Sequence, residues 1–559
     1  MKKIYNQNKE LITKIKHVIY ELRRQNHSRG MQLLRFMHVL MTEFLTQVLE
    51  HKDYFNEEYV TLDEIYIMEL LESITKSQKQ NDYHLLADLL ELQLLPFLIS
   101  LQTVIQSKED VLMLSNHYEQ NLLLLEQYDN KLYQLVKDDT SISKRYLPEP
   151  TTNGSVTIKV VNEADSFYLT SNNDPQDTAR LFADAYYTPR ASQYILYGIE
   201  LLNHANAFIE HKDIFCVEVY ESDLDMIQLA VMYGSLHHLS TNRLKIIYDP
   251  DLTKLASRTQ IPDSDRVLAI HQPSIRTIKK KEIREKFENL FIVDSSIRNQ
   301  NDWMISNFFS NIKNCNHYVD ELFDQFCDKD VYLIAAGPSL DKNIELLRQK
   351  PENSIIFAVG TVHKKLENMG IKADYTIITD AKKTLIGQIR GVKKEDFSLI
   401  LLSTACKELA MVHKGVKYLV CQSGFPEAEK YAKEHNYNLY GTGGSVTTTA
   451  LDICLRLKAK RIILLGADMA HTDSQTHATG TSGRRMADME GLIPIQSVDG
   501  GIVYTTRVLN MYKEWIEKRI AKEVDAKVID ATEGGALIKG TRICTLKEII
   551  EPSSVKDFD

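Results

Sequence analysis

The feature that most constrains the fold is an alternation of short apolar runs with segments of helical spacing, which begins near residue 155. Strands that alternate with helices along a chain form parallel sheets, and helices then cover both faces of the sheet. The sequence therefore predicts an α/β fold. The first expected strands are Val156–Val160, Tyr194–Tyr197, Ile214–Val219, Leu244–Tyr248 and Val267–Ile270.

One strand-to-helix transition is a candidate ligand site. The apolar run from Val331 to Ala336 stops at Gly337-Pro338-Ser339, and helical spacing follows. Glycine permits backbone conformations closed to other residues, proline suits a helix entry, and serine can cap the free N–H groups of a first turn. Because a helix N-terminus attracts anions, we expect Gly337, Pro338 and Ser339 to hold a phosphate. The alternative is an ordinary turn with a serine N-cap.

Other residues are expected at the same edge of the sheet. Gly360 and Thr361 follow the apolar run Ile355–Val359, and Asp380 follows the next expected strand. Ligands of open α/β sheets gather beyond the carboxyl ends of the strands, so these residues are candidates for binding the same ligand.

A second loop is rich in glycine and hydroxyl groups. It contains Gly443, Gly444 and Ser445 and leads into an expected helix over residues 451–458. Backbone N–H groups at such a loop form anion-binding concavities. The alternative is a flexible loop in which serine or threonine caps the helix.

Acids and imidazoles follow the buried strand that begins at Arg461. His477 and His471 are candidate general bases because histidine accepts protons near neutral pH, and Asp468 is a candidate to orient or stabilise the base. A histidine that only fixes the loop is the alternative. Arg484, in a glycine-rich loop further on, is a candidate contact for an anionic ligand. Tight metal-ligand spacing is absent, so we expect no metal.

The chain before residue 150 has a different pattern. Glycine and proline are scarce, and apolar residues recur every three or four positions, which predicts a helical domain in which Pro96 interrupts one helix. The proline-containing stretch Tyr146–Gly154 has the composition of a linker. We therefore expect a helical domain at residues 1–150, α/β domains at 151–310 and 311–545, and a C-terminal tail at 546–559.

Composition and charge limit the classes of function. A chain of 559 residues is too long to fold around a single hydrophobic core. Its content of 43% hydrophobic and 26% charged residues is typical of globular domains. A net charge of -9 argues against a nucleic-acid-binding surface. Seven cysteines without CxxC spacing indicate reduced thiols. With no signal-peptide pattern and no apolar run of membrane-spanning length, we expect a cytoplasmic protein; a homo-oligomer is compatible with the sequence.

Several motifs in order resemble one known family. They are Gly337-Pro338-Ser339-Leu340, Gly443-Gly444-Ser445-Val446, Gly466-Ala-Asp468-Met-Ala-His471 with His477, and Ala531-Thr-Glu-Gly-Gly-Ala536. Together with Asn173-Asp174-Pro175 and the strand before Gly198, they make the chain similar, over roughly residues 155 to 545, to the motility-associated factor (Maf) family of flagellin glycosyltransferases.

The resemblance implies a fold and an activity. It implies a Rossmann-like, doubly wound central domain similar to bacterial sialyltransferases, beside a second, smaller α/β domain and an N-terminal all-helical region. The implied reaction is transfer of a nonulosonic acid, such as pseudaminic or legionaminic acid, from its CMP ester to Ser or Thr of flagellin, with no cofactor. Gly337, Pro338 and Ser339 match the family's donor-binding turn, and Gly443 to Ser445 match a second ligand loop.

Two other functions stay open. One is a pterin diphosphokinase-like enzyme, in which the phosphate site expected at Gly337, Pro338 and Ser339 would hold ATP and magnesium would be required. The other is a non-enzymatic flagellin-binding assembly factor, in which the helical region binds the partner and the sheet is only a scaffold.

Overall fold

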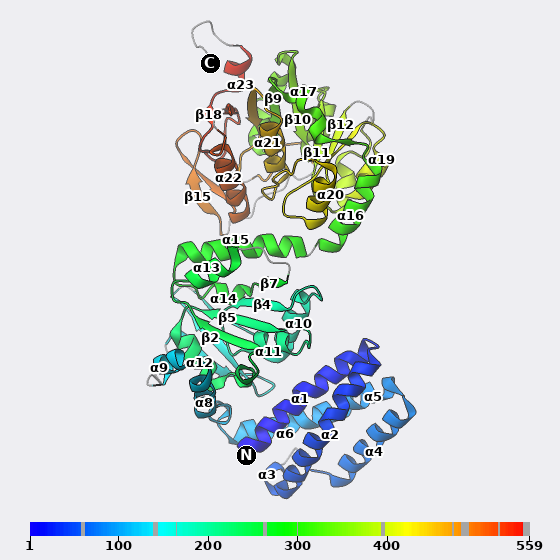
Figure 1. Cartoon of the computed structure of the whole chain (residues 1–559), viewed down its shortest axis with the longest axis vertical. Coiled ribbons are helices and arrows are strands. Elements are labelled where there is room, and N and C mark those ends of the chain that lie inside the picture. Colours follow the sequence, from blue (N-terminus) through cyan, green and yellow to red (C-terminus); the bar gives the residue numbers. More distant parts are fainter. Residues whose placement is uncertain are drawn as a thin grey trace. The chain divides into compact units, whose positions relative to one another are not determined.

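The computed structural model describes residues 1–56, 62–137, 144–163, 165–260, 265–298, 300–392, 397–471, 475–481, 491–523 and 526–551. The chain forms two compact units, Met1–Glu288 and Asn289–Asp559 (Figure 1). The structure is mixed α/β with parallel sheets and an N-terminal helical region, as the sequence predicts.

The first unit begins with the helical region. On α1 the buried side chains recur every three or four positions, so one face of the helix packs into the core and against α2. The elements are α1 (Lys2–Arg23), α2 (His27–Glu50), α3 (Lys52–Phe55), α4 (Glu64–Gln80), α5 (Tyr83–Leu89), the π-helix η1 (Leu90–Leu94), α6 (Leu95–Lys108), α7 (Val111–Leu114), α8 (Tyr118–Tyr128) and α9 (Asn130–Val136).

The expected break at Pro96 is absent, because the chain stays helical from Tyr83 to Lys108. The wide π turn η1 ends two residues before the proline, which lies in the first turn of α6, where a missing backbone N–H is tolerated. An 18-residue window of this helix has a mean hydropathy of 1.5, so by length and composition alone the helix could cross a membrane, which is also true of core helices in soluble proteins. Leu86, Leu90 and Leu98 are buried in the helical core, as in a core helix of a globular domain.

The stretch Tyr146–Gly154, which the sequence predicts as a linker, begins with a strand, β1 (Tyr146–Pro150). This strand pairs with β2 (Val156–Val161) in an antiparallel sheet of order β1-β2-β3. Prolines are tolerated there because β1 is an edge strand, and Pro148 and Pro150 alternate so that neither has to donate to β2. Strand β3 comprises Ser166–Tyr168.

The remaining strands of the first unit form a parallel sheet of order β6-β5-β4-β7. Strand β6 has the predicted bounds, and the others begin or end within two residues of them. The elements are α10 (Pro175–Tyr186), β4 (Gln193–Tyr197), α11 (Asn203–Ile209), β5 (Cys216–Glu221), α12 (Leu224–Tyr233), η2 (His237–Thr241), β6 (Leu244–Tyr248), α13 (Thr253–Gln260), β7 (Arg266–Ala269), α14 (Gln272–Ile275) and α15 (Lys281–Arg298), which continues past Glu288.

The second unit is built on a nine-stranded sheet in which every pairing is parallel, in the order β18-β17-β14-β9-β10-β11-β12-β13-β8. All six residues of β10 are buried, as expected for a sheet covered on both faces. The strands are β8 (His317–Tyr318), β9 (Asp330–Ile334), β10 (Ser354–Val359), β11 (Tyr375–Ile378), β12 (Ser398–Leu402), β13 (Lys417–Val420), β14 (Arg461–Leu465), β17 (Val528–Asp530) and β18 (Arg542–Ile543).

The strand order reverses at β9, because the chain runs outward from β9 to β13 and then returns to place β14 on the other side of β9. Such a reversal opens a crevice at the carboxyl ends of the two strands. The other elements are α16 (Asn301–Asn314), η3 (Val319–Leu322), α17 (Phe323–Phe326), η4 (Pro338–Lys342), η5 (Ile344–Gln349), α18 (Gly360–Asn368), η6 (Lys383–Gln388), α19 (Lys407–Val412), α20 (Pro426–His435), α21 (Val446–Arg456), β15 (Ile493–Gln496), β16 (Ile502–Thr505), α22 (Arg507–Ile520) and α23 (Leu546–Ile550).

Two segments of this unit differ from the sequence prediction. The segment after Gly337 is a pair of short 3-10 helices, η4 and η5, in place of one α-helix. Part of the predicted tail is the helix α23, whose Leu546 and Ile549 are buried in the core of the unit.

Candidate active site

Two neighbouring cavities lie at the carboxyl edge of the nine-stranded sheet. The larger has a volume of about 740 Å³ and is lined by the loops that follow β10, β11, β12 and β13. The smaller, of about 220 Å³, lies at the loops that follow β9 and β14, where the strand order reverses. Thr361, Ser445, His477 and Tyr512 line both, so the two form one continuous candidate site.

Most of the predicted site residues meet here. Gly360, Thr361, Asp380, Gly444, Ser445 and His477 line the larger cavity, and Gly337 and Asp468 line the smaller. Pro338, Ser339, Gly443 and His471 are beside the site without lining either cavity. Arg484 lies outside the described residues.

The Gly-Pro-Ser turn is bound by a protein carboxylate. Asp468, itself buried, accepts hydrogen bonds from the backbone N–H of Ser339 (3.0 Å) and from its hydroxyl (2.5 Å). A Cβ at Gly337 would lie 2.1 Å from Asp468 Oδ1 and 2.5 Å from the carbonyl oxygen of Gly466. The N–H group that the sequence predicts as a phosphate donor therefore already has an anionic partner, and glycine at 337 is required by the close packing of this turn.

The second glycine loop leads into a helix as expected, but this helix, α21, begins at Val446, five residues before the expected start. The Ser445 hydroxyl accepts hydrogen bonds from the N–H groups of Thr447 and Thr448, and the Thr448 hydroxyl accepts one from the N–H of Ser445, which makes a reciprocal cap. Gly443 and Gly444 both have positive φ (55° and 88°). An added Cβ would meet the Trp515 ring at 2.5 Å or the Tyr512 ring at 2.8 Å, both on α22. These glycines thus let α22 pack directly over the loop.

The edge of the larger cavity carries amide and hydroxyl groups. Gln388 Nε2 donates to the hydroxyl of Thr361 at 3.1 Å, while Gln388 Oε1 is buried and has no hydrogen-bond partner among the described residues. Asp380 is exposed on the rim; burial and the negative charge of Asp380 raise the pKa of Tyr512. The site therefore offers acceptors and donors for a polar ligand.

His477 differs from His471 in position. The loop after His477 is fixed by the Ala478 N–H, which donates to the Ala336 carbonyl at 2.9 Å, and by Lys365 of α18, whose Nζ donates to the Thr479 carbonyl at 2.7 Å. His471 instead pairs through its backbone with Tyr504, at 2.8 Å from N to O. Of the two histidines, only His477 lines the cavities.

Sequence reasoning missed several lining residues. Thr404 and Gln422 follow β12 and β13, and they hydrogen-bond each other at 2.9 Å inside the edge of the sheet. Their position directly after apolar strands is the signal that would have identified them. Tyr512 carries no such signal, because it comes from α22, far along the chain from the strands it covers.

Among the residues that the structure describes, no group of three or more His, Cys, Asp and Glu side chains is arranged to hold a metal ion. Metal independence stays a prediction.

Comparisons with known proteins give three findings. Residues 306–474 match the family model "6-hydroxymethylpterin diphosphokinase MptE-like". No curated protein matches the chain at the required significance. Among solved structures, the chain is similar to the MAf glycosyltransferase from Magnetospirillum magneticum AMB-1, with 13% sequence identity, a TM-score of 0.39, and coverage of 76% of this chain and 74% of that one.

Proposed function

We propose that the chain is a glycosyltransferase that moves a nonulosonic acid from its CMP ester to a serine or threonine hydroxyl of flagellin in the cytoplasm. The observation that carries this proposal is the convergence of Thr361, Asp380, the Gly444-Ser445 loop and His477 on one cavity of about 740 Å³. That volume is in the range of small-molecule sites, and the cavity lies where open α/β sheets bind ligands. The motif order described above favours this donor and this acceptor.

The donor phosphate is proposed to bind at the start of α21. The N-cap Ser445 and residues Val446 and Thr449 of this eleven-residue helix line the larger cavity, so the positive end of the helix dipole faces the ligand. The group that caps this helix is a neutral hydroxyl, which does not repel a phosphate as a carboxylate does. This location replaces the Ser339 turn, whose N–H is bound by Asp468. Asp468 and Gly337 are then part of the wall that shapes the smaller cavity.

His477 is the proposed general base. The acceptor hydroxyl oxygen attacks the anomeric carbon while its proton passes to the neutral imidazole. The bond between the anomeric carbon and the phosphate oxygen breaks, and CMP leaves with the electron pair. A single displacement of this kind inverts the anomeric centre. Positive charge at the helix N-terminus would stabilise the leaving phosphate without a metal.

The experiment is to incubate the purified full-length chain with flagellin and a panel of CMP-activated sugars, and to read the acceptor by intact mass. A mass increase equal to one nonulosonic acid residue, with release of CMP, is the expected result. Unmodified flagellin with every donor would overturn the proposal and leave the assembly-factor alternative, for which flagellin binding without modification is the outcome.

A second candidate, ATP-dependent pyrophosphoryl transfer to a pterin alcohol, is favoured by the family-model match over residues 306–474. The two candidates differ in their response to chelation. The proposed transfer from CMP should keep most of its turnover in excess EDTA, because no step assigned to it uses a cation. Activity that requires magnesium, and ATP in place of a CMP-sugar, would favour the diphosphokinase.

A further inference from the structure

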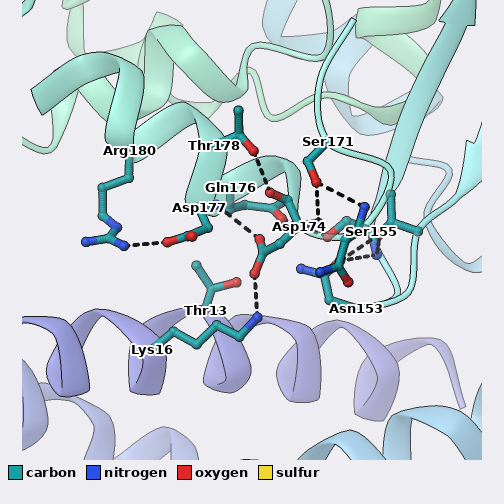
Figure 2. Close-up of polar contacts among 12 residues, drawn as sticks. Thr13, Lys16, Asn153, Ser155, Ser171, Asp174, Gln176, Asp177, Thr178 and Arg180 are labelled. Carbon is teal, nitrogen blue, oxygen red and sulfur yellow. Dashed lines mark hydrogen bonds and ion pairs between the residues drawn. The ribbon is translucent and has the colours of Figure 1, made fainter. Parts of the chain in front are cut away.

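A separate cavity, of about 490 Å³, lies within the first unit between the helical region and the α/β region. Its walls come from α1, the start of α8, the N-terminal part of α10, α11 and the segment after α12. Figure 2 shows one wall, where Lys16 of α1 reaches Asp174, the N-cap of α10, at 2.5 Å, and Arg180 pairs with Asp177. These ion pairs neutralise that side of the cavity.

Two basic side chains on another side of the cavity have no acidic partner in the described part of the chain. Lys9 and His117 both line it, and the charge of Lys9 acts on the His117 ring. Neither forms an ion pair with any residue that the structure describes. Burial lowers the pKa of Lys9 to about 8, and burial together with the charges of Lys9 and Lys2 lowers the pKa of His117 to about 4. Near pH 7 Lys9 therefore carries a positive charge with no described acid paired to it, while the neutral His117 ring can donate a hydrogen bond, and the two together form a place for an anion.

The rest of the lining indicates the ligand class. Thr13, Gln120, Asn203 and Ser235 contribute neutral hydroxyl and amide groups, and Asn206 has a buried side-chain oxygen without a hydrogen-bond partner among the described residues. Leu124, Leu201, Ala207 and Tyr233 add apolar surface beside these groups. The neutral donors and acceptors match the hydroxyl groups of a sugar or polyol, and the apolar surface can contact its carbon skeleton.

We propose that this cavity binds a small polyhydroxylated anion, a sugar or polyol that carries one phosphate or carboxylate, with the anionic group at Lys9 and His117. The site does not depend on the transferase function proposed above. Because its walls include both α1 and the α/β region, the bound ligand ties these two parts of the first unit together.

The test is hydrogen–deuterium exchange of the full chain with glucose 6-phosphate, glucuronate or neutral glucose at matched ionic strength. We expect the phosphate or the carboxylate to slow exchange in segments that cover residues 9–17 and 117–124, with glucose much weaker. The anion that binds more tightly identifies the preferred group. Lys9→Met, which keeps the length of the side chain, should weaken that binding at least about tenfold.

Lys14→Met is the matched control. Lys14 lies on the same helix, is 44% exposed, pairs with Glu10 and does not line the cavity. Binding unchanged in Lys14→Met and weakened in Lys9→Met supports the site. No protection of these segments by either anion, equal protection by glucose, or equal affinity in Lys9→Met and the natural chain would overturn it.

Discussion

Asp468 binds both the N–H and the hydroxyl of Ser339, so a substitution at Gly337 acts on this contact before it acts on any ligand. A side chain at position 337 collides with the carboxylate and with the Gly466 carbonyl. Loss of donor binding in Gly337→Val would therefore report a broken turn and would not locate the phosphate. Substitutions at residues that line the cavity without supporting the turn are the sharper probes.

His477, which lines both cavities, and His471, which lines neither, form a matched pair for this purpose. We expect His477→Ala to lower the single-turnover transfer rate about 100-fold or more, because a general base is lost, with donor affinity near normal. His471→Ala should stay within about threefold of the natural rate, since His471 contacts Tyr504 through backbone that alanine retains. Calorimetry for the donor and rapid quench for transfer supply both quantities. Parallel loss of affinity and rate in His477→Ala would instead identify a loop anchor.

The burial of Lys9 should also make the stability of the protein depend on pH. Burial lowers the pKa of Lys9 from 10.5 to about 8, so the unfolded chain binds more protons than the folded chain between these values. Unfolding free energy should therefore rise with pH across that window. Below this pH window the full free-energy cost of burying the charged lysine is present. We therefore expect Lys9→Met to stabilise the unliganded protein by about 1 to 3 kcal/mol near pH 7.

The measurement is denaturant unfolding of Lys9→Met and the natural chain at about pH 7 and about pH 9.5. The difference between the two proteins should shrink at the higher pH. A Lys9→Met protein that is less stable at both values would show that Lys9 has a structural partner, and it would remove the argument that the residue is kept for a ligand.

At the scale of elements, the loop that carries His477 depends on α18. Lys365 is buried there and donates to Asp341 (2.5 Å) and to the Thr479 carbonyl (2.7 Å), while the Thr479 N–H donates to Asp341 (2.9 Å). We expect Lys365→Met to lower turnover about 10- to 100-fold through misplacement of His477, with donor affinity little changed. Lys364→Met, one position earlier on α18 and outside this contact, is the control, and steady-state rates with donor titration separate the two effects.

Equal activity of both variants would show that the loop keeps its position without the lysine. A folded Lys365→Met protein that also loses donor binding would place the loop in the donor site itself.

How far sequence predicts structure also differs between elements. Parallel strands such as β10 were predictable because burial on both faces makes them continuous apolar runs. Strand β1 was not, because an edge position tolerates the prolines that normally mark a linker. The helix expected after Ser339 is instead two 3-10 segments, one of them started by a contact with Asp468, a residue 129 positions away. Such long-range contacts leave no local signal.

The same distinction applies to the site. Residues that end a strand, such as Thr361 and Asp380, could be placed on the rim because the carboxyl ends of parallel strands share one edge. Tyr512 and Gln388 could not, since they reach the cavity from a distant helix and from a 3-10 segment whose packing depends on the folded sheet.

At the scale of the whole molecule, the residues that line the two neighbouring cavities all belong to the second unit, which also has a hydrophobic core of its own. We therefore expect a fragment from Lys281 to Asp559, which keeps α15 whole, to fold and to bind CMP within about threefold of the full chain. Calorimetry with CMP measures the affinity, and cooperative thermal unfolding checks that the fragment is folded.

The fragment also tests whether the donor and the acceptor bind to the same unit. If the first unit contributes only to recognition of the protein acceptor, the fragment should bind or hydrolyse the CMP-sugar as the full chain does. Its transfer to flagellin should fall far below that of the full chain, because acceptor binding positions the attacking hydroxyl. Full transfer by the fragment would confine both substrates to the second unit. A folded fragment that fails to bind CMP would show that the donor site needs residues of the first unit, and it would contradict the assignment of the whole catalytic site to the carboxyl edge of the nine-stranded sheet.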